Sequence, residues 1–86
     1  MATLDLLYFA WVREGVGLGH EVVDPPHEVA SVSDLIAWLA ARGGGYAAAL
    51  GDRDRLRAAV DQVFVPLDAP IAGAREVAIF PPVTGG

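Results

Sequence analysis

The chain of 86 residues contains no cysteine and no lysine. Without cysteine it can form no disulfide, no thiolate metal site and no thiol nucleophile, and no side chain can carry a persulfide. Without lysine its only amine is the N-terminus, so lysine-linked conjugation of one copy to another is excluded. The basic residues are all arginines, namely Arg13, Arg42, Arg53, Arg55, Arg57 and Arg75.

Long apolar runs and an excess of positive charge are also missing. No run approaches the roughly 20 apolar residues of a membrane-spanning helix, and Met1–Asp5 lacks the basic start of a signal peptide. The net charge of −5 argues against nucleic acid and anionic membranes as partners, because both are bound through Lys and Arg. A protein partner with a basic surface fits better, and we expect a cytoplasmic protein.

The apolar content of 53% is enough for the core of one small domain. The clearest predicted element is a helix over Ser31–Arg42, because Ser31 is a good N-cap and apolar residues follow at i, i+3, i+4 and i+7. Those residues are Val32, Leu35, Ile36 and Leu39. Strands are predicted over Thr3–Phe9, His20–Asp24, Ala58–Val65 and Arg75–Phe80, and helical turns over Ala10–Glu14 and Tyr46–Leu50. This order predicts an α+β fold, with one main helix packed on one face of a small mixed sheet.

Alternation along three of these strands predicts an apolar patch on the solvent side of the sheet. In each strand, phenylalanine shares a face with a polar residue, which is Asp5, Gln62 or Glu76. If the strands are neighbours, the patch consists of Leu7, Phe9, Phe64 and Phe80. Exposed apolar patches often mark partner sites; the alternative is that loops cover these side chains.

The last residues are Phe80-Pro81-Pro82-Val83-Thr84-Gly85-Gly86. The two prolines end the last strand and favour an extended chain, and the two β-branched residues after them are stiff. Gly85 and Gly86 let the backbone pass through a narrow channel and leave the terminal carboxylate unobstructed. This end suits a carboxylate that another enzyme activates; the alternative is a frayed end with glycines by chance. We therefore predict a domain over residues 1–80 and an extended tail over residues 81–86.

Several segments point to a family when they are taken together. They are the opening strand with Ala10-x-x-Arg13-Glu14, the Ser31-capped helix with Leu35, Ala58–Gln62, Asp68-x-Pro70 and Glu76–Gly86. With them the chain resembles the ubiquitin-like sulfur carriers, most closely the small subunit of molybdopterin synthase (the MoaD family). A terminal Gly-Gly alone is a weak signal, whereas the full terminal run after the Glu-Val-Ala strand is specific. The resemblance implies a β-grasp fold, which suits the predicted order of elements.

The resemblance also implies a reaction sequence. An ATP-dependent, E1-like adenylyltransferase would convert the Gly86 carboxylate to an acyl-adenylate. A sulfur donor, either a rhodanese or a cysteine desulfurase, would then provide the sulfur of a thiocarboxylate. The tail would enter the active site of the large synthase subunit, where two carriers supply the two sulfurs added to cyclic pyranopterin monophosphate.

The family suggests a heterotetramer of two carriers and a dimer of large subunits. ATP is used by the activating partner, so we expect no permanently bound cofactor and no metal. The tail offers no general acid or base, so the chain would not be catalytic alone.

The resemblance assigns roles to individual residues. Gly86 would bear the sulfur and Gly85 would give access to it. The threaded tail would also include Pro81, Pro82, Val83 and Thr84. The positions with which such carriers dock their partners are matched by Phe9, Phe64 and Phe80.

Arg13 belongs to the family's Arg-Glu pair. It would contact a partner, or form a local ion pair with Glu14 or another acid. One departure is Asp61, which stands where the family commonly has Asn and could alter a contact. A metal site at His20 and His27 is not expected, because neither has a cysteine or a helical pairing nearby.

Two other interpretations stay open. One keeps the sulfur-carrier chemistry but changes the pathway to thiamine, tungsten-pterin or amino-acid sulfur supply. The other is a non-catalytic β-grasp binding module with a passive tail. The Phe-Pro-Pro-Val-Thr-Gly-Gly end and the Ala-x-x-Arg-Glu element favour the molybdopterin pathway over the other pathways. Removal of Gly86 separates a carrier, which would lose its function and keep its fold, from a passive module, which would lose neither.

Overall fold

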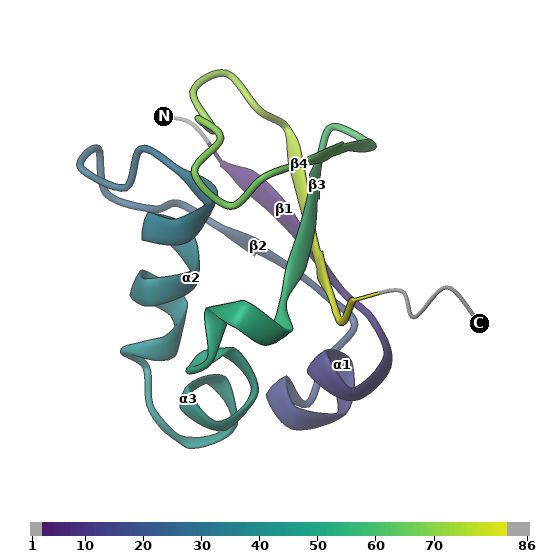
Figure 1. Ribbon diagram of the computed structural model, residues 1–86. Coiled ribbons are helices and arrows are strands. Elements are labelled where there is room, and N and C mark those ends of the chain that lie inside the picture. The colour runs from purple at the N-terminus through teal and green to yellow at the C-terminus, as the bar shows by residue number, and fades with distance from the viewer. Residues whose placement is uncertain (1–2, 83–86) are drawn as a thin grey trace.

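The computed structural model describes residues 3–82, which form a five-stranded mixed sheet with helices packed against it (Figure 1). The strands are β1 Leu4–Tyr8, β2 His20–Val23, β3 Arg57–Val60, β4 Val63–Val65 and β5 Glu76–Phe80. Their order in the sheet is β2-β1-β5-β3-β4, with β1 and β5 parallel and the other pairs antiparallel. The predicted α+β class is confirmed.

The helices are α1 Ala10–Val16, α2 Val32–Ala40 and α3 Gly44–Leu50, and a 3₁₀ helix, η1, spans Arg53–Arg55. In Figure 1, α2 and α3 lie on one side of the sheet, and α1 lies at the end where β1 stops. Helices α1 and α3 pack closely against each other. There is no room for a side chain at Gly45, because an added Cβ would collide with the carbonyl oxygen of Gly15. The opposite face of the sheet is covered by no helix of residues 3–82; we call it the open face.

Helix α2 begins where the sequence predicts. The Ser31 hydroxyl accepts the backbone N–H of Asp34, and the Asp34 carboxylate accepts the N–H of Ser31, which together form a capping box. The apolar stripe predicted for this helix is confirmed as fully buried. The helix ends at Ala40 rather than Arg42, because the last residues form a turn toward α3.

The hydrophobic core lies between the sheet and the helices. The strands contribute the side chains that point toward the helices, away from the open face. Each helix contributes apolar side chains from the side that faces the sheet. Its largest fully buried members are Leu6, Tyr8, Val12, Val32, Leu35, Ile36, Leu39, Leu50, Leu56, Val77 and Ile79. Burying one such side chain contributes about 1.5–3 kcal/mol, so the core fixes the strand positions on which the open face depends.

The predicted single strand over Ala58–Val65 is wrong. Asp61 and Gln62 have φ angles of 48° and 71°, the left-handed values that a two-residue hairpin turn requires. The segment therefore folds back on itself as β3 and β4, with Val60 opposite Val63. The sheet has five strands instead of the four predicted.

The C-terminal boundary agrees with the sequence as far as it is described. Strand β5 ends at Phe80, and Pro81 and Pro82 follow outside any helix or strand. The predicted tail residues Val83, Thr84, Gly85 and Gly86 lie outside the described residues. The division into a domain over 1–80 and a tail over 81–86 therefore stays a prediction.

None of the helices in the part of the chain that the structure describes has the length and apolar character needed to cross a membrane.

Candidate functional site

The open face carries a continuous apolar row across four strands. Leu7 of β1 lies opposite Ala78 of β5, Ala78 lies opposite Ala59 of β3, and Ala59 lies opposite Phe64 of β4. Each of these residues alternates with a core residue in its strand, so all four point away from the helices. The predicted apolar patch on this face is confirmed, including the side assigned to Phe64.

A shallow groove runs over this row and reaches the end of β5. The small side chains of Ala59 and Ala78 form its floor, between larger apolar side chains. The groove is lined by Leu7, Phe9, Ala10, Ala59, Gln62, Phe64, Glu76, Ala78, Phe80, Pro81 and Pro82. Neither Ala59 nor Ala78 was predicted as a site residue, although Ala78 shares a face of the last strand with Phe80.

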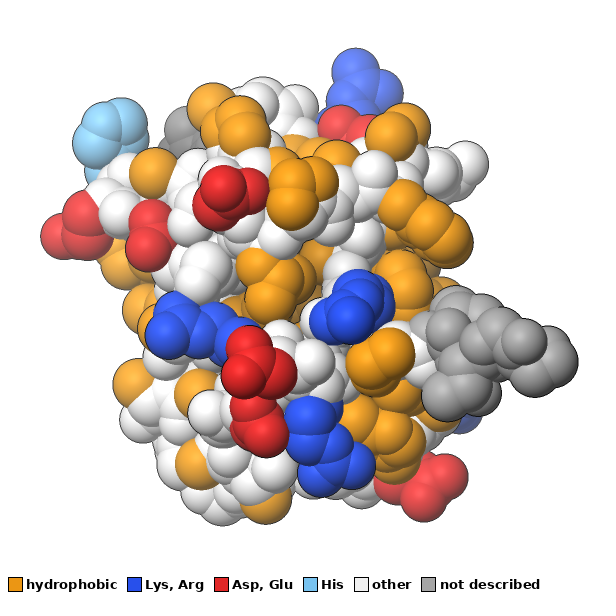
Figure 2. Space-filling model, in the orientation of Figure 1, with side chains coloured by type: hydrophobic (Ala, Val, Ile, Leu, Met, Phe, Trp, Pro, Cys, Tyr) orange, Lys and Arg blue, Asp and Glu red, His pale blue; other side chains and the backbone are white. Residues whose placement is uncertain are grey.

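The three candidate phenylalanines come together at this groove. Phe64 is 76% exposed and Phe9 is 48% exposed, whereas Phe80 is half-buried. The rings of Phe64 and Phe80 contact each other, with centroids 5.5 Å apart and planes tilted by 43°. Figure 2 shows hydrophobic side chains gathered on the flank of the molecule where β5 ends. Exposed apolar surface of this kind is typical of a partner site.

The backbone fixes the position of Phe9 beside the groove. Its N–H donates to the carbonyl oxygen of Ile79 in β5, and its own carbonyl oxygen accepts the N–H groups of Val12 and Arg13 in α1. The next residue, Ala10, has a φ of 53°, a left-handed conformation that is uncommon for a residue other than glycine. This abrupt change of direction presents the Phe9 ring outward, while Tyr8 points into the core.

The tail begins inside the same groove. Pro81 and Pro82 are half-buried and line it next to Phe80. A partner that covers the groove therefore also contacts the first residues of the predicted tail. The candidate sulfur-bearing residue Gly86 and its neighbour Gly85 are outside the described residues.

Arg13 lies outside the apolar row, in a polar depression between α1 and β2. Its guanidinium group packs against the backbone of Gly19, where an added Cβ would approach Arg13 Nε to 3.1 Å. Within residues 3–82, Arg13 forms no ion pair with Glu14 or another acid, so the local ion pair offered as an alternative is wrong. The partner contact stays a prediction.

The open face also includes His20, which lies opposite Leu7 at the outer strand. His20 Nε2 is 3.8 Å from Asp5 Oδ1, and both side chains are more than half exposed. Within the described residues, no group of three or more His, Asp or Glu side chains is placed to hold a metal ion.

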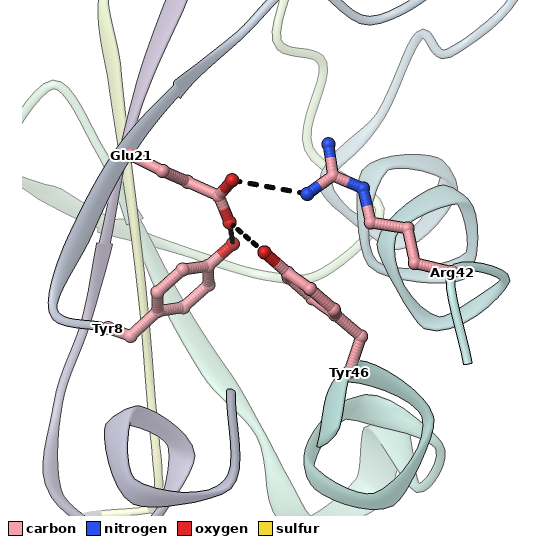
Figure 3. A network of polar contacts seen from close by, with 4 residues as sticks. All are labelled: Tyr8, Glu21, Arg42 and Tyr46. Atoms are coloured by element: carbon pink, nitrogen blue, oxygen red, sulfur yellow. Dashed lines mark hydrogen bonds and ion pairs between the residues drawn. The ribbon is translucent and has the colours of Figure 1, made fainter. Parts of the chain in front are cut away.

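A separate polar cluster lies on the helix side of the sheet (Figure 3). The Glu21 carboxylate of β2 accepts hydrogen bonds from the hydroxyls of Tyr8 and Tyr46, both at 2.8 Å, and from Arg42 Nη1 at 3.1 Å. The Arg42 guanidinium also lies over the rings of Tyr46 and Trp38. The cluster therefore ties the outer strand β2 to α3 and to the end of α2, on the face away from the groove.

Burial raises the pKa of Glu21, but the hydrogen bonds from Tyr8, Tyr46 and Arg42 outweigh it, so the pKa lies below its usual value of 4.5. Burial and then the bond to Glu21 raise the pKa of the Tyr8 hydroxyl far above its usual range. Glu21 is therefore charged and Tyr8 protonated at neutral pH. A carboxylate with a lowered pKa stabilises the fold above its unfolded-state pKa, and this contribution is lost as the pH falls through the folded-state pKa.

We expect Glu21→Gln to destabilise the fold at neutral pH by about 1–3 kcal/mol, because the neutral amide accepts weaker hydrogen bonds from its buried partners. The difference from the unaltered chain should shrink as the pH falls below 4.5, because Glu21 is protonated first in the unfolded chain and, at a lower pH, in the folded chain as well. Urea unfolding between pH 3 and pH 7 measures both effects. Glu28→Gln is the control, because Glu28 is exposed and the substitution removes the same charge; an equal loss in the control would contradict this account.

The ThiS family model matches residues 6–86, which include every groove-lining residue and the terminal glycines. The chain belongs to the ThiS family. Over 83 residues it is 41% identical to the molybdopterin synthase sulfur carrier subunit of Escherichia coli K12 and 34% identical to that of Haemophilus influenzae Rd. Each alignment covers 96% of this chain and 99% of the relative.

Structural comparison agrees with membership of the ThiS family. The crystal structure of SAMP1 from Haloferax volcanii matches with a TM-score of 0.70 and 26% sequence identity, over 99% of this chain and all of that one. The ubiquitin-like β-grasp fold implied by the sequence is confirmed. The family resemblance proposed from the terminal run and the Ala-x-x-Arg-Glu element is confirmed as well.

Asp61, at the position where the resemblance to the MoaD family implies Asn, has a structural role. Its Oδ1 accepts the backbone N–H groups of Arg75 at 2.9 Å and Glu76 at 3.0 Å. An asparagine side-chain oxygen could accept the same two bonds, and both residues tolerate the left-handed backbone. Aspartate therefore preserves the turn and adds a negative charge next to β5.

Proposed function

We propose that this chain is the sulfur carrier subunit of a molybdopterin synthase. The observation that carries the proposal is the 41% identity to a subunit of that name, which extends over 96% of the chain. The apolar groove that begins at the tail supports it, because a carrier must dock its partner and deliver its end at the same time. The chain would work in the cytoplasm, together with the enzymes that load and unload it.

The terminal carboxylate is the chemical centre of this function. A free carboxylate resists substitution because oxide is a poor leaving group. An E1-like adenylyltransferase would let the Gly86 carboxylate attack the α-phosphate of ATP, releasing pyrophosphate and forming an acyl-adenylate. A persulfide sulfur would then displace AMP, and a thiol would reduce the resulting S–S bond, which leaves a thiocarboxylate on Gly86.

The residues of this chain have binding roles and not catalytic ones in that sequence. Gly85 and Gly86 let the end enter a narrow active site, and the tail residues from Pro81 to Thr84 can pair with a partner through their backbone groups. Phe9, Phe64 and Phe80 would anchor the large synthase subunit on the open face. Arg13 would contact a partner from the neighbouring depression. ATP would bind only at the adenylyltransferase, so this chain holds no cofactor of its own.

Sulfur transfer follows from the same arrangement. The large subunit would receive the tail and direct the Gly86 sulfur to cyclic pyranopterin monophosphate. Because the product has two dithiolene sulfurs and each carrier end holds one, two carriers would be consumed for each molybdopterin. Two carriers on a dimer of large subunits account for that stoichiometry. A rhodanese or a cysteine desulfurase would supply the persulfide.

The mass of the C-terminal peptide tests the proposal directly. The chain is produced in cells that contain the activating enzyme and sulfur donor, and is then digested to a fragment that contains Gly86 and excludes Met1. Exclusion of Met1 matters because its oxidation mimics an oxygen-to-sulfur exchange in the intact mass. We expect the mass gain of one such exchange on the fragment. An unmodified Gly86 in the presence of ATP, activating enzyme and sulfur donor would instead favour a passive binding module.

A further inference from the structure

The groove is bordered by acidic side chains on the side away from the tail. Asp5 of β1 lies directly opposite Glu76 of β5 on the open face. Asp61 follows β3 beside them, since its N–H donates to the Glu76 carbonyl oxygen and its side chain accepts the Glu76 N–H. Three carboxylates from three adjacent parts of the sheet therefore form one row, which we call the acidic border.

Two like charges of this row, Asp5 and Glu76, face each other across neighbouring strands. Like charges at directly opposite positions of a sheet destabilise it. Within residues 3–82, no arginine forms an ion pair with any of the three carboxylates; Arg75 reaches Asp61 only through its backbone N–H, and His20 Nε2 lies 3.8 Å from Asp5 Oδ1. The oxygen of Asp61 is needed for the hairpin turn, but its charge is not, because a neutral asparagine could accept the same bonds.

The border of the groove next to the tail carries the opposite charge. Arg57 of β3 lies directly opposite Phe80 of β5, on the open face. Its Nη1 donates to the carbonyl oxygens of Leu56 and Asp54, and it forms no ion pair with a carboxylate of the described chain. From Glu76 to Phe80 the strand advances four residues, or roughly 13 Å. The apolar row therefore lies between an acidic border and a cationic border.

This arrangement suits a partner of defined chemistry. We propose that the protein that covers the groove brings apolar side chains onto the Leu7–Phe64 row and places a cluster of Lys or Arg side chains against the acidic border. The cluster would lie about 13 Å from Phe80, where the predicted tail begins, because that is the length of β5 between the two borders. The net charge of −5 steers the encounter, and the opposite charges of the two borders set the orientation in which the partner docks.

The inference rests on the proposed function, because the partner used to test it is the large synthase subunit of the same organism. Beyond the proposed function, it specifies the charge of the partner's surface and the orientation in which the partner docks. It also gives the charge of Asp61 a role at the acidic border, since the turn itself does not require that charge.

The test uses paired charge-neutral substitutions with nearly unchanged shape. Asp5→Asn and Glu76→Gln are combined in one variant, and Asp61→Asn is made separately. The control combines Glu28→Gln and Asp68→Asn, which removes the same charge from two exposed positions that do not line the groove. Association with the large subunit is followed by stopped-flow fluorescence at several salt concentrations, and each free chain is unfolded thermally.

We expect the Asp5/Glu76 variant to associate about tenfold more slowly at low salt, with a flatter dependence on salt, because a border charge acts mainly on the encounter rate. Asp61→Asn should have a smaller effect in the same direction, and the control should associate at nearly the unaltered rate. The free Asp5/Glu76 variant should be at least as stable as the unaltered chain, because it has lost a repulsion.

Two results would overturn the inference and leave the proposed function intact. In one, the Asp5/Glu76 variant associates at the unaltered rate with the same salt dependence. In the other, the control slows as much as that variant, so that only net charge matters. If the unaltered chain itself does not bind the large subunit, the proposed function fails and the inference fails with it.

Discussion

Removal of Gly86 abolishes sulfur transfer and leaves the fold intact; this is the largest effect that we expect from any single change. The terminal carboxylate is the only group that can hold the transferred sulfur, because the chain contains no cysteine. Shortening the chain by one residue places the new carboxylate about 3.3–3.6 Å short of the reacting position. A misplacement of even 1 Å can cost about a hundredfold in rate.

Molybdopterin formation in a reconstituted synthase measures this loss, and thermal unfolding of the truncated chain measures the fold. The unfolding midpoint should not change, because the sheet ends at Phe80 and, within residues 3–82, the buried core includes only residues before it. A chain extended by one alanine after Gly86 is the matched control, because it keeps both glycines and removes only the terminal position of the carboxylate. We expect it to be as inactive as the truncated chain. Molybdopterin formation by either variant would show that the tail is passive.

Sequence patterns predicted the parts of the fold that local physical chemistry determines. Helix α2 is an example, because its capping box and its buried stripe both lie within one short segment. The face of Phe64 was also predicted, since alternation along a strand does not depend on which neighbour the strand pairs with. The candidate docking face could therefore be predicted from alternation along three separate segments, on the assumption that the three strands are neighbours in one sheet.

The turn between β3 and β4 shows where such patterns fail. Asp61 and Gln62 both have a left-handed backbone, and the usual sequence signal for that is a glycine at the second position. This turn has no such glycine, because contacts with residues far along the chain stabilise it instead. The Asp61 side chain holds the N–H groups of Arg75 and Glu76, which are 14 and 15 residues away. No local pattern contains that information.

The Glu21 cluster was missed for the same reason. Its partners Tyr8, Arg42 and Tyr46 are 13, 21 and 25 residues from Glu21, and they come from β1, from the turn after α2 and from α3. Tyr8 is buried, Glu21 and Tyr46 are half-buried and Arg42 is exposed, so no common burial pattern links them in the sequence. The arrangement arises only when the sheet brings β2 beside the ends of α2 and α3.

Phe64→Ala should weaken binding to the large synthase subunit by about 2–4 kcal/mol, or roughly 30-fold to 1,000-fold. The ring is 76% exposed in the free chain and borders a groove floored by alanines, so a partner that covers the groove removes most of its surface from water. Aromatic side chains in this situation contribute more than their neighbours to a protein interface. The free chain should lose only about 0.5–1.5 kcal/mol of stability, from the contact with Phe80.

Val63→Ala is the matched control for this prediction. Val63 is the preceding residue of the same strand and is 63% exposed, but it points to the opposite face of the sheet. Isothermal titration of the large subunit with each variant separates the two faces, and thermal unfolding accounts for changes in stability. Equal losses of affinity in both variants would place the interface at the edge of β4. A loss confined to Phe64→Ala would place it on the open face, where the tail begins.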